Sequence, residues 1–152
     1  MSLESNQRST VVRILSPLHA ISAENVCPGF PDVVFIGGVL ELKTADRWPV
    51  RADSVLTAGV MNHPKKGFTP QQRVFALKRR RAQGFHCVCL QVDHDWFLIP
   101  GELAAKHLGV DWTRADIIKG SWRHWLGGLN KNEFYNAIVK ATEKSRGWNP
   151  YE

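Results

Sequence analysis

The sequence is poor in the features that mark secreted, membrane-spanning and zinc-bound proteins. It holds only three cysteines, and no two of them form a C-x-x-C pair, which argues against a disulfide framework or a structural zinc site. No apolar run approaches the ~20 residues that span a bilayer, and residues 1–10 are too polar for a signal peptide. We therefore expect a cytoplasmic protein with no membrane partner.

Several common enzyme motifs are missing as well. The chain has no G-x-S-x-G, no P-loop and no H-E-x-x-H pattern, which argues against the serine, phosphate-cradling and zinc-protease sites that these motifs build. We expect no organic cofactor. No internal repeat or low-complexity segment divides the sequence, so we expect a single domain over residues 1–152.

The chain has more basic than acidic residues, in an otherwise ordinary composition. Hydrophobic residues make up 43% and charged residues 22% of the 152 positions, which is typical of a soluble domain with one core. The formal net charge is +6 and the isoelectric point is about 9.5. A basic small domain favours a polyanionic partner such as nucleic acid, although charge alone does not identify it.

The segment 29–43 (GFPDVVFIGGVLELK) predicts a β-hairpin. Two short apolar runs, 33–36 and 39–43, are separated by Gly37-Gly38. A two-residue glycine link suits a tight hairpin turn, because such turns need positive φ angles. We therefore expect two antiparallel strands, with the Gly-Gly pair forming the turn between them.

The second strand of this hairpin carries charged residues on one face. Side chains alternate along a strand, so Glu41 and Lys43 share one face while Leu40 and Leu42 point into the core. Asp32 begins the neighbouring strand. Two carboxylates and an ammonium group are therefore expected to converge beside the sheet.

This combination suits a hard divalent cation and a phosphate group. Mg²⁺ and Mn²⁺ prefer oxygen ligands, which Asp32, Glu41 and the backbone carbonyl of Leu42 could supply. Lys43 would lie close enough to activate a water molecule or to stabilise charge on a phosphate. The chemistry indicated is metal-assisted hydrolysis of a phosphodiester bond.

The same residues resemble the PD-(D/E)XK nuclease signature. Pro31-Asp32 and Glu41-Leu42-Lys43 stand in its order, and Gly29-Phe30 extends the first block to G-x-P-D. This extended block is similar to that of virus-type replication-repair nucleases (the VRR-NUC group) and archaeal-type Holliday junction resolvases.

A second block carries the resemblance further. The sequence FTPQQRVF at 68–75, followed by Gly84, is similar to the T-P-x-Q helix of VRR-NUC proteins. The segment RWPVR at 47–51 is similar to small phage-encoded members. The resemblance covers roughly residues 29–100, but Leu90-Gln91-Val92 replaces the arginine motif of the VRR-NUC group.

The resemblance implies an α/β fold and a nuclease activity. The expected fold is a restriction-endonuclease-like core over about residues 1–100, a mixed sheet of about four or five strands flanked by helices, with a helical extension at 101–152. The expected activity is Mg²⁺- or Mn²⁺-dependent cleavage of DNA. Relatives cut branched or flapped DNA, often as homodimers, and a phage-encoded member would work in the host cytoplasm.

Gln72 has two interpretations. Thr69, Pro70 and Gln72 occupy the N-cap, first and third positions of a predicted helix, where Thr69 and Gln72 form a capping box. The resemblance implies instead that Gln72 reaches the metal site and orients water, as a catalytic residue beside Asp32, Glu41 and Lys43. The sequence leaves both roles open.

The resemblance also implies a third acidic metal ligand. Nuclease relatives often carry it on the first helix, where Glu4 is the only acid. Glu24, near the end of a weakly alternating segment close to Asp32, is the rival candidate. Both could equally be solvated surface residues, since carboxylates are favoured near helix N-termini in any case.

DNA contacts are expected from basic residues around the site. A long irregular segment follows Lys43 and should border the site. The candidates in it and in the following helix are Arg47, Arg51, Lys65, Lys66, Arg73 and Arg80. The alternative is that these are ordinary solvated charges, and Trp48 is expected to pack on the core rather than stack on a base.

Periodicity predicts the remaining elements. Helices are expected at 4–15, 69–83 and 102–108, with further starts at Thr113 and Asn130, and strands at 18–24, 85–92 and 96–99. Cys87 and Cys89 should be small buried side chains of the second of these strands. Two other functions stay open on the same fold: a DNA-binding module without catalysis, and a phage interaction or assembly protein.

Overall fold

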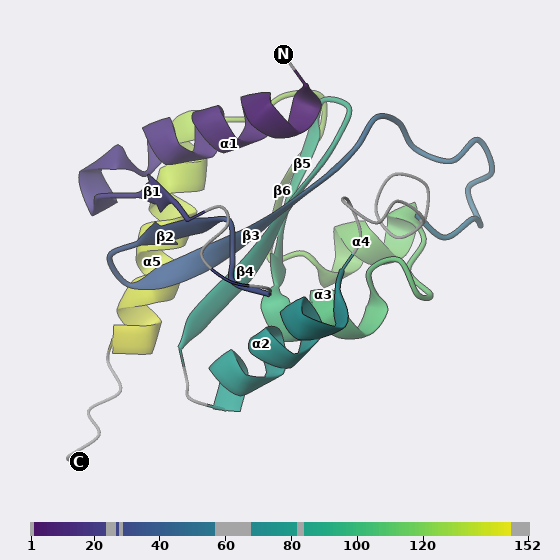
Figure 1. The fold of residues 1–152 in the computed structure, drawn as a ribbon. Coiled ribbons are helices and arrows are strands. Elements are labelled where there is room, and N and C mark those ends of the chain that lie inside the picture. The colour runs from purple at the N-terminus through teal and green to yellow at the C-terminus, as the bar shows by residue number, and fades with distance from the viewer. Residues whose placement is uncertain (1, 24–26, 28, 57–67, 82–83, 147–152) are drawn as a thin grey trace.

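In the part of the chain that the structure describes, six strands form one sheet, and helices cover both of its faces (Figure 1). The computed structural model describes residues 2–23, 27, 29–56, 68–81 and 84–146. The strands are β1 (Ile21–Ser22), β2 (Val33–Phe35), β3 (Gly38–Ala45), β4 (Phe85–Val92), β5 (Asp95–Pro100) and β6 (Arg123–Trp125). The α/β fold with a mixed sheet and a C-terminal helix is confirmed.

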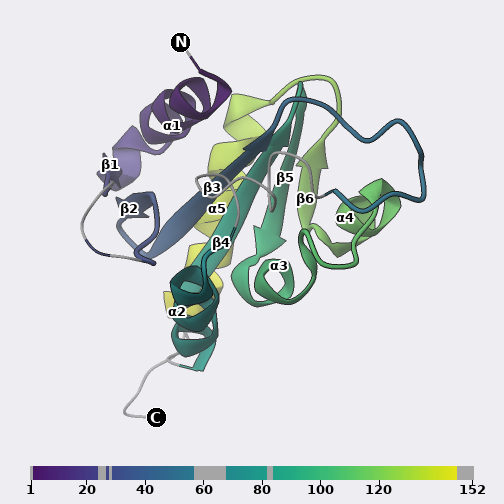
Figure 2. The same cartoon turned by 45° about the vertical axis from the view of Figure 1, so that its right-hand side comes forward.

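The helices surround this sheet in two groups. They are α1 (Leu3–Ile14), the short 3₁₀ turn η1 (Ser16–Leu18), α2 (Pro70–Arg81), α3 (Gly101–His107), α4 (Arg114–Gly120) and α5 (Lys131–Arg146). In both views α1 and α5 cover one face of the sheet, whereas α2, α3 and α4 lie on the other (Figures 1 and 2). No helix within the described ranges is long and apolar enough to cross a membrane.

The sheet contains one parallel pair. Its strands follow the order β1 to β6, and every neighbouring pair is antiparallel except β3 and β4. Parallel neighbours need a crossover connection, and the chain between β3 and β4 includes α2. This crossover is what brings α2 onto the face of the sheet where Glu41 and Lys43 lie.

The expected alternation on β3 sorts its residues between two cores. Leu40 and Leu42 pack with Cys87 and Cys89 beneath α1 and α5. The other face of β4 contributes Val88, Leu90 and Val92 to a second apolar cluster with α3 and α4. Both cysteines are buried and neither forms a disulfide, as expected.

The strand count of four or five was too low. The missed strand is β6, which pairs with β5 at the edge of the sheet. Its Arg123 and His124 are exposed and only Trp125 is buried. The sequence of β6 therefore lacks the alternation of apolar and polar residues that predicts a strand. β6 and α5 both contribute to the core under β3, which means that the helical extension covers the sheet.

The hairpin turn is shifted by one residue from its expected place. Phe35 pairs with Gly38, so Ile36 and Gly37 form the turn, and Gly37 takes the positive φ of 105°. Gly38 instead begins β3, where a Cβ atom would collide with the ring of Phe85 on β4. The first glycine therefore serves the turn and the second serves the approach of two strands.

His86 on β4 is a partly buried histidine with a shielded ring nitrogen. Its ring lies against Phe75 of α2, and its Nδ1 atom is buried without a hydrogen-bond partner. Burial, and secondarily the charge of Arg79, lower the pKa of His86 from 6.5 to about 4. The native protein therefore holds a neutral imidazole at pH values where the unfolded chain would protonate it.

This predicts an acid-sensitive fold. The unfolded chain binds the extra proton below pH 6.5, so stability should be lost as the pH falls from 6.5 toward 4, by an amount on the order of 1–3 kcal/mol. His86→Leu should flatten this part of the profile in urea unfolding. His94→Gln, which removes a histidine from an exposed turn, is the control; a profile unchanged in His86→Leu would contradict the assignment.

Candidate active site

Asp32 lies directly opposite Glu41 at the end of the hairpin. The register pairs Val33 with Leu40, and extending it by one residue sets Asp32 across from Glu41, on the same face of the sheet. The Asp32 Oδ2 atom accepts a hydrogen bond of 2.8 Å from the Leu42 amide. The two carboxylates predicted to converge are therefore neighbours.

The Leu42 carbonyl is directed to the same edge. In an extended strand the N–H and C=O groups of one residue point toward the same neighbour. The Leu42 N–H points to Asp32, and β2 pairs no further along β3 than Leu40. The Leu42 carbonyl is thus directed to the space beyond the end of β2, beside Asp32.

Glu41 and Lys43 form a buried ion pair on the α2 side of β3. Their exposed fractions are 2% and 5%, and Glu41 Oε1 lies 3.0 Å from Lys43 Nζ. Buried charges are costly unless they are paired and hydrogen-bonded. The surroundings of this pair therefore decide whether β3 can keep both residues in the interior.

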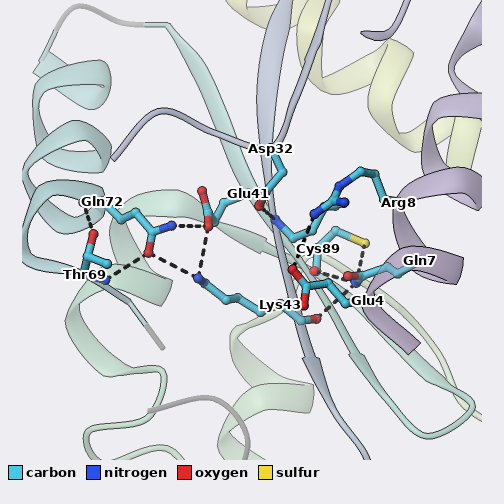
Figure 3. Close-up of polar contacts among 10 residues, drawn as sticks. Glu4, Gln7, Arg8, Asp32, Glu41, Lys43, Thr69, Gln72 and Cys89 are labelled. Carbon is cyan, nitrogen blue, oxygen red and sulfur yellow. Dashed lines mark hydrogen bonds and ion pairs between the residues drawn. The ribbon is translucent and has the colours of Figure 1, made fainter. Parts of the chain in front are cut away.

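Gln72 completes the group from the first turn of α2 (Figure 3). Its Nε2 donates to Glu41 Oε1 at 2.6 Å, and its Oε1 accepts from Lys43 Nζ at 3.2 Å. The same Oε1 accepts from the Thr69 amide at 2.9 Å, while Thr69 Oγ1 accepts from the Gln72 amide at 3.1 Å. Gln72 therefore completes the capping box and also contacts Glu41 and Lys43, while its role in orienting water stays a prediction.

The electrostatics of the site are dominated by burial, which disfavours the charged form of a carboxyl group. Burial is the main cause that raises the pKa of Glu41 from 4.5 to about 8, and the nearby Asp32 adds to it. The ammonium of Lys43 acts in the opposite direction but does not outweigh burial. A cation placed at the two carboxylates would favour their ionised forms.

The donor atoms fit a hard divalent cation. Asp32, Glu41 and the Leu42 carbonyl offer oxygen atoms beside the end of β2, and oxygen is the ligand type that Mg²⁺ and Mn²⁺ prefer. Within the described residues, no three His, Cys, Asp or Glu side chains gather as a metal cluster.

Of the two candidates for the third acid, the structure describes only Glu4, which is paired with Arg8. The carboxylate of Glu4 lies 3.4 Å from the Arg8 guanidinium, one turn further along α1. Glu24 lies outside the residues that the structure describes. The metal-ligand role of these two glutamates stays a prediction from the resemblance.

Helix α1 supplies a glutamine that the sequence reasoning missed. Gln7 is fully buried, and its Nε2 donates to the carbonyls of Lys43 at 3.1 Å and Cys89 at 3.0 Å. It therefore holds the backbones of β3 and β4 at the position of Lys43. The signal was available, because Gln7, Val11 and Leu15 recur every four residues and put an amide into the apolar stripe of the first helix.

The residues expected to contact DNA have different surroundings. Arg47 and Arg51 lie on the surface after β3, and Arg51 is paired with Asp53 at 3.7 Å in an exposed position. The Arg73 guanidinium donates to the Ala105 carbonyl of α3, so it also joins two helices. Lys65, Lys66 and the side chain of Arg80 lie outside the described part of the chain.

Trp48 packs on the core, as expected. Its ring meets Phe97 edge to face, and its Nε1 donates to Asp95 Oδ2 at 2.7 Å. Asp95 also accepts from the Gly127 amide. The Trp48 side chain, on the segment that follows β3, is therefore held against β5.

The raised pKa of Glu41 predicts a pH-dependent stability for the metal-free protein. The native state keeps a proton that the unfolded chain releases above pH 4.5, so stability should fall as the pH rises from 4.5 through about 8. Glu41→Gln cannot ionise and should flatten this slope in urea unfolding. Glu143→Gln, at an exposed position, should leave the slope unchanged. Equal slopes in Glu41→Gln and the parent protein would rule this account out.

Comparisons with known proteins add no family to this geometry. No protein-family model matches the chain, and no curated protein matches it. The case for a function therefore depends on the site itself: two adjacent carboxylates, a buried ammonium and a glutamine amide brought together from the hairpin and α2.

Proposed function

We propose that this protein is a divalent-metal-dependent endonuclease that hydrolyses phosphodiester bonds in DNA. One observation carries the proposal: Asp32 and Glu41 lie side by side, and Glu41, Lys43 and Gln72 contact one another at distances of 2.6 to 3.2 Å. A purely structural role would not require a charged pair and a second carboxylate side by side on β3 and the start of β2. This is the set of groups that metal-assisted hydrolysis needs.

Asp32, Glu41 and the Leu42 carbonyl would hold Mg²⁺ or Mn²⁺. When bound, such an ion supplies a Lewis acid for the phosphate and lowers the pKa of water. The role of Asp32 and Glu41 is to fix the ion at the strand edge. Because Asp32 also accepts from the Leu42 amide, the orientation of its carboxylate is set by the strand that carries the other ligands.

Lys43 and Gln72 would act on the substrate and the attacking water. The Lys43 ammonium provides a fixed positive charge for the phosphate and assists the water. Gln72 is held at both ends of its amide, by Glu41 on one side and by Thr69 and Lys43 on the other. Such a pre-oriented amide can align a water molecule with little loss of entropy.

DNA is the substrate class that the charge balance favours. The chain has a net charge of +6, and Arg47 and Arg51 lie exposed on the segment that leaves β3 directly after the site. Exposed arginines of this kind bind phosphate groups along a backbone. The resemblance to resolvase-like nucleases adds branched or flapped DNA as the preferred shape, a homodimer as the working form, and the cytoplasm, of a host cell if phage-encoded, as the place of action.

The proposal predicts a specific pattern of lost activity. Wild-type protein should cut at least one of single-stranded, duplex, flapped or four-way-junction DNA with Mg²⁺ or Mn²⁺, and not with EDTA. Asp32→Ala, Glu41→Ala and Lys43→Ala should each lower cleavage by roughly a hundredfold or more, since each removes charge from the reacting centre. Gel assays with purified, folded variants measure this.

Matched controls come from exposed residues of the same types. Asp111→Ala and Lys78→Ala remove an exposed carboxylate and an exposed ammonium away from the buried group and should keep wild-type cleavage. If no DNA is cut while wild type and variants bind DNA equally, the protein is a binding module on this fold. If DNA is neither cut nor bound, an interaction or assembly role replaces the nuclease proposal.

A further inference from the structure

Phe68 lies against the ammonium group of the candidate site. It immediately precedes Thr69, the N-cap residue of α2, and its side chain is buried, with 7% exposed. The Lys43 Nζ atom lies over its ring, 4.9 Å from the centroid. A cation within about 6 Å of an aromatic centroid is attracted by the negative charge of the ring face.

The ring adds a third kind of contact to Lys43. Glu41 Oε1 and Gln72 Oε1 approach the ammonium at 3.0 and 3.2 Å. Both of these oxygen atoms belong to groups that the proposed reaction uses. Phe68 is different, because its ring can hold the ammonium without supplying a ligand, a proton or a hydrogen bond to the substrate.

Phe68 also belongs to the segment that positions Gln72. The backbone amide of Thr69, the next residue, donates to Gln72 Oε1. Arg73 lies over the Phe68 ring, with its Cζ atom 5.4 Å from the centroid, and donates to the Ala105 carbonyl of α3. The Phe68 ring therefore contacts both the Lys43 ammonium and the Arg73 guanidinium, which links α2 to α3.

We propose that Phe68 is a positioning residue for DNA cleavage, which holds the Lys43 ammonium beside Glu41 and Gln72. This inference rests on the proposed nuclease function. Without the ring face, the long lysine side chain gains rotamer freedom, and its charge is less often at the reacting phosphate. Because Phe68 is buried and does not face solvent, its loss should act on kcat and leave the KM for DNA unchanged.

A fluorination series at Phe68 tests this without changing the shape of the core. Mono-, di- and trifluorophenylalanine withdraw electrons from the ring face and weaken its attraction for a cation. We expect a stepwise fall in kcat that reaches about three- to thirtyfold in the trifluoro protein, the range that corresponds to a cation–π contact. KM and the melting temperature should stay near wild type. Phe68→Leu, which keeps an apolar side chain without a ring, should lower kcat at least as much.

Phe97 provides the matched control. It is a fully buried phenylalanine of the same apolar cluster, and its ring contacts Trp48 and His124. The same series at Phe97 should leave kcat unchanged. A flat kcat across the Phe68 series, or an equal fall in both series, would show that the Phe68 ring serves packing alone and would overturn the proposal.

A second measurement separates this inference from the nuclease proposal. In protein labelled with nitrogen-15 lysine, the Lys43 ammonium signal is assigned by its loss in Lys43→Arg, and its proton exchange with water is measured. Exchange should become faster along the Phe68 series and stay constant along the Phe97 series. If wild type cuts no DNA, the nuclease function fails, and this measurement still decides whether Phe68 holds Lys43: equal exchange in all proteins overturns it.

Discussion

The burial of a charged pair on β3 is the constraint on which the rest of the site depends. Glu41 and Lys43 are almost fully removed from solvent, and such a pair is stable only when its remaining hydrogen-bonding capacity is met. Gln72 meets it with both ends of one amide, and the Phe68 ring covers the ammonium. Helix α2 must therefore begin at one place, directly over the pair.

The sheet topology determines the position of α2. β3 and β4 are parallel, so the chain between them has to cross over a face of the sheet, and α2 lies on the crossover. The capping box of Thr69 and Gln72 starts α2 at Pro70. On the opposite face, Gln7 fixes the backbone of Lys43. One strand is thus held from both sides at the same residue.

Much of this could be predicted from the sequence, because the patterns involved are local. Strand alternation places Glu41 and Lys43 together, Thr69 and Gln72 form the expected capping box, and a helix starts after Thr113 as expected. The features that the sequence did not predict depend on contacts between residues far apart in the chain. The three mostly exposed residues of β6 form a strand only because they pair with β5. Position 38 needs a glycine because a Cβ atom there would collide with the Phe85 ring of β4.

The sequence by itself determined which groups share a strand face, where α2 starts, and that two acids and a lysine stand near one another along the hairpin. Only the tertiary structure decided that Gln72 caps its helix and reaches Glu41 at once, that burial raises the pKa of Glu41 to about 8, and that Phe68 and Gln7 enclose Lys43. The physical reason is the sequence separation over which each interaction acts. Alternation and capping act over two to four residues, whereas desolvation and contacts across the sheet depend on which distant segments are packed together.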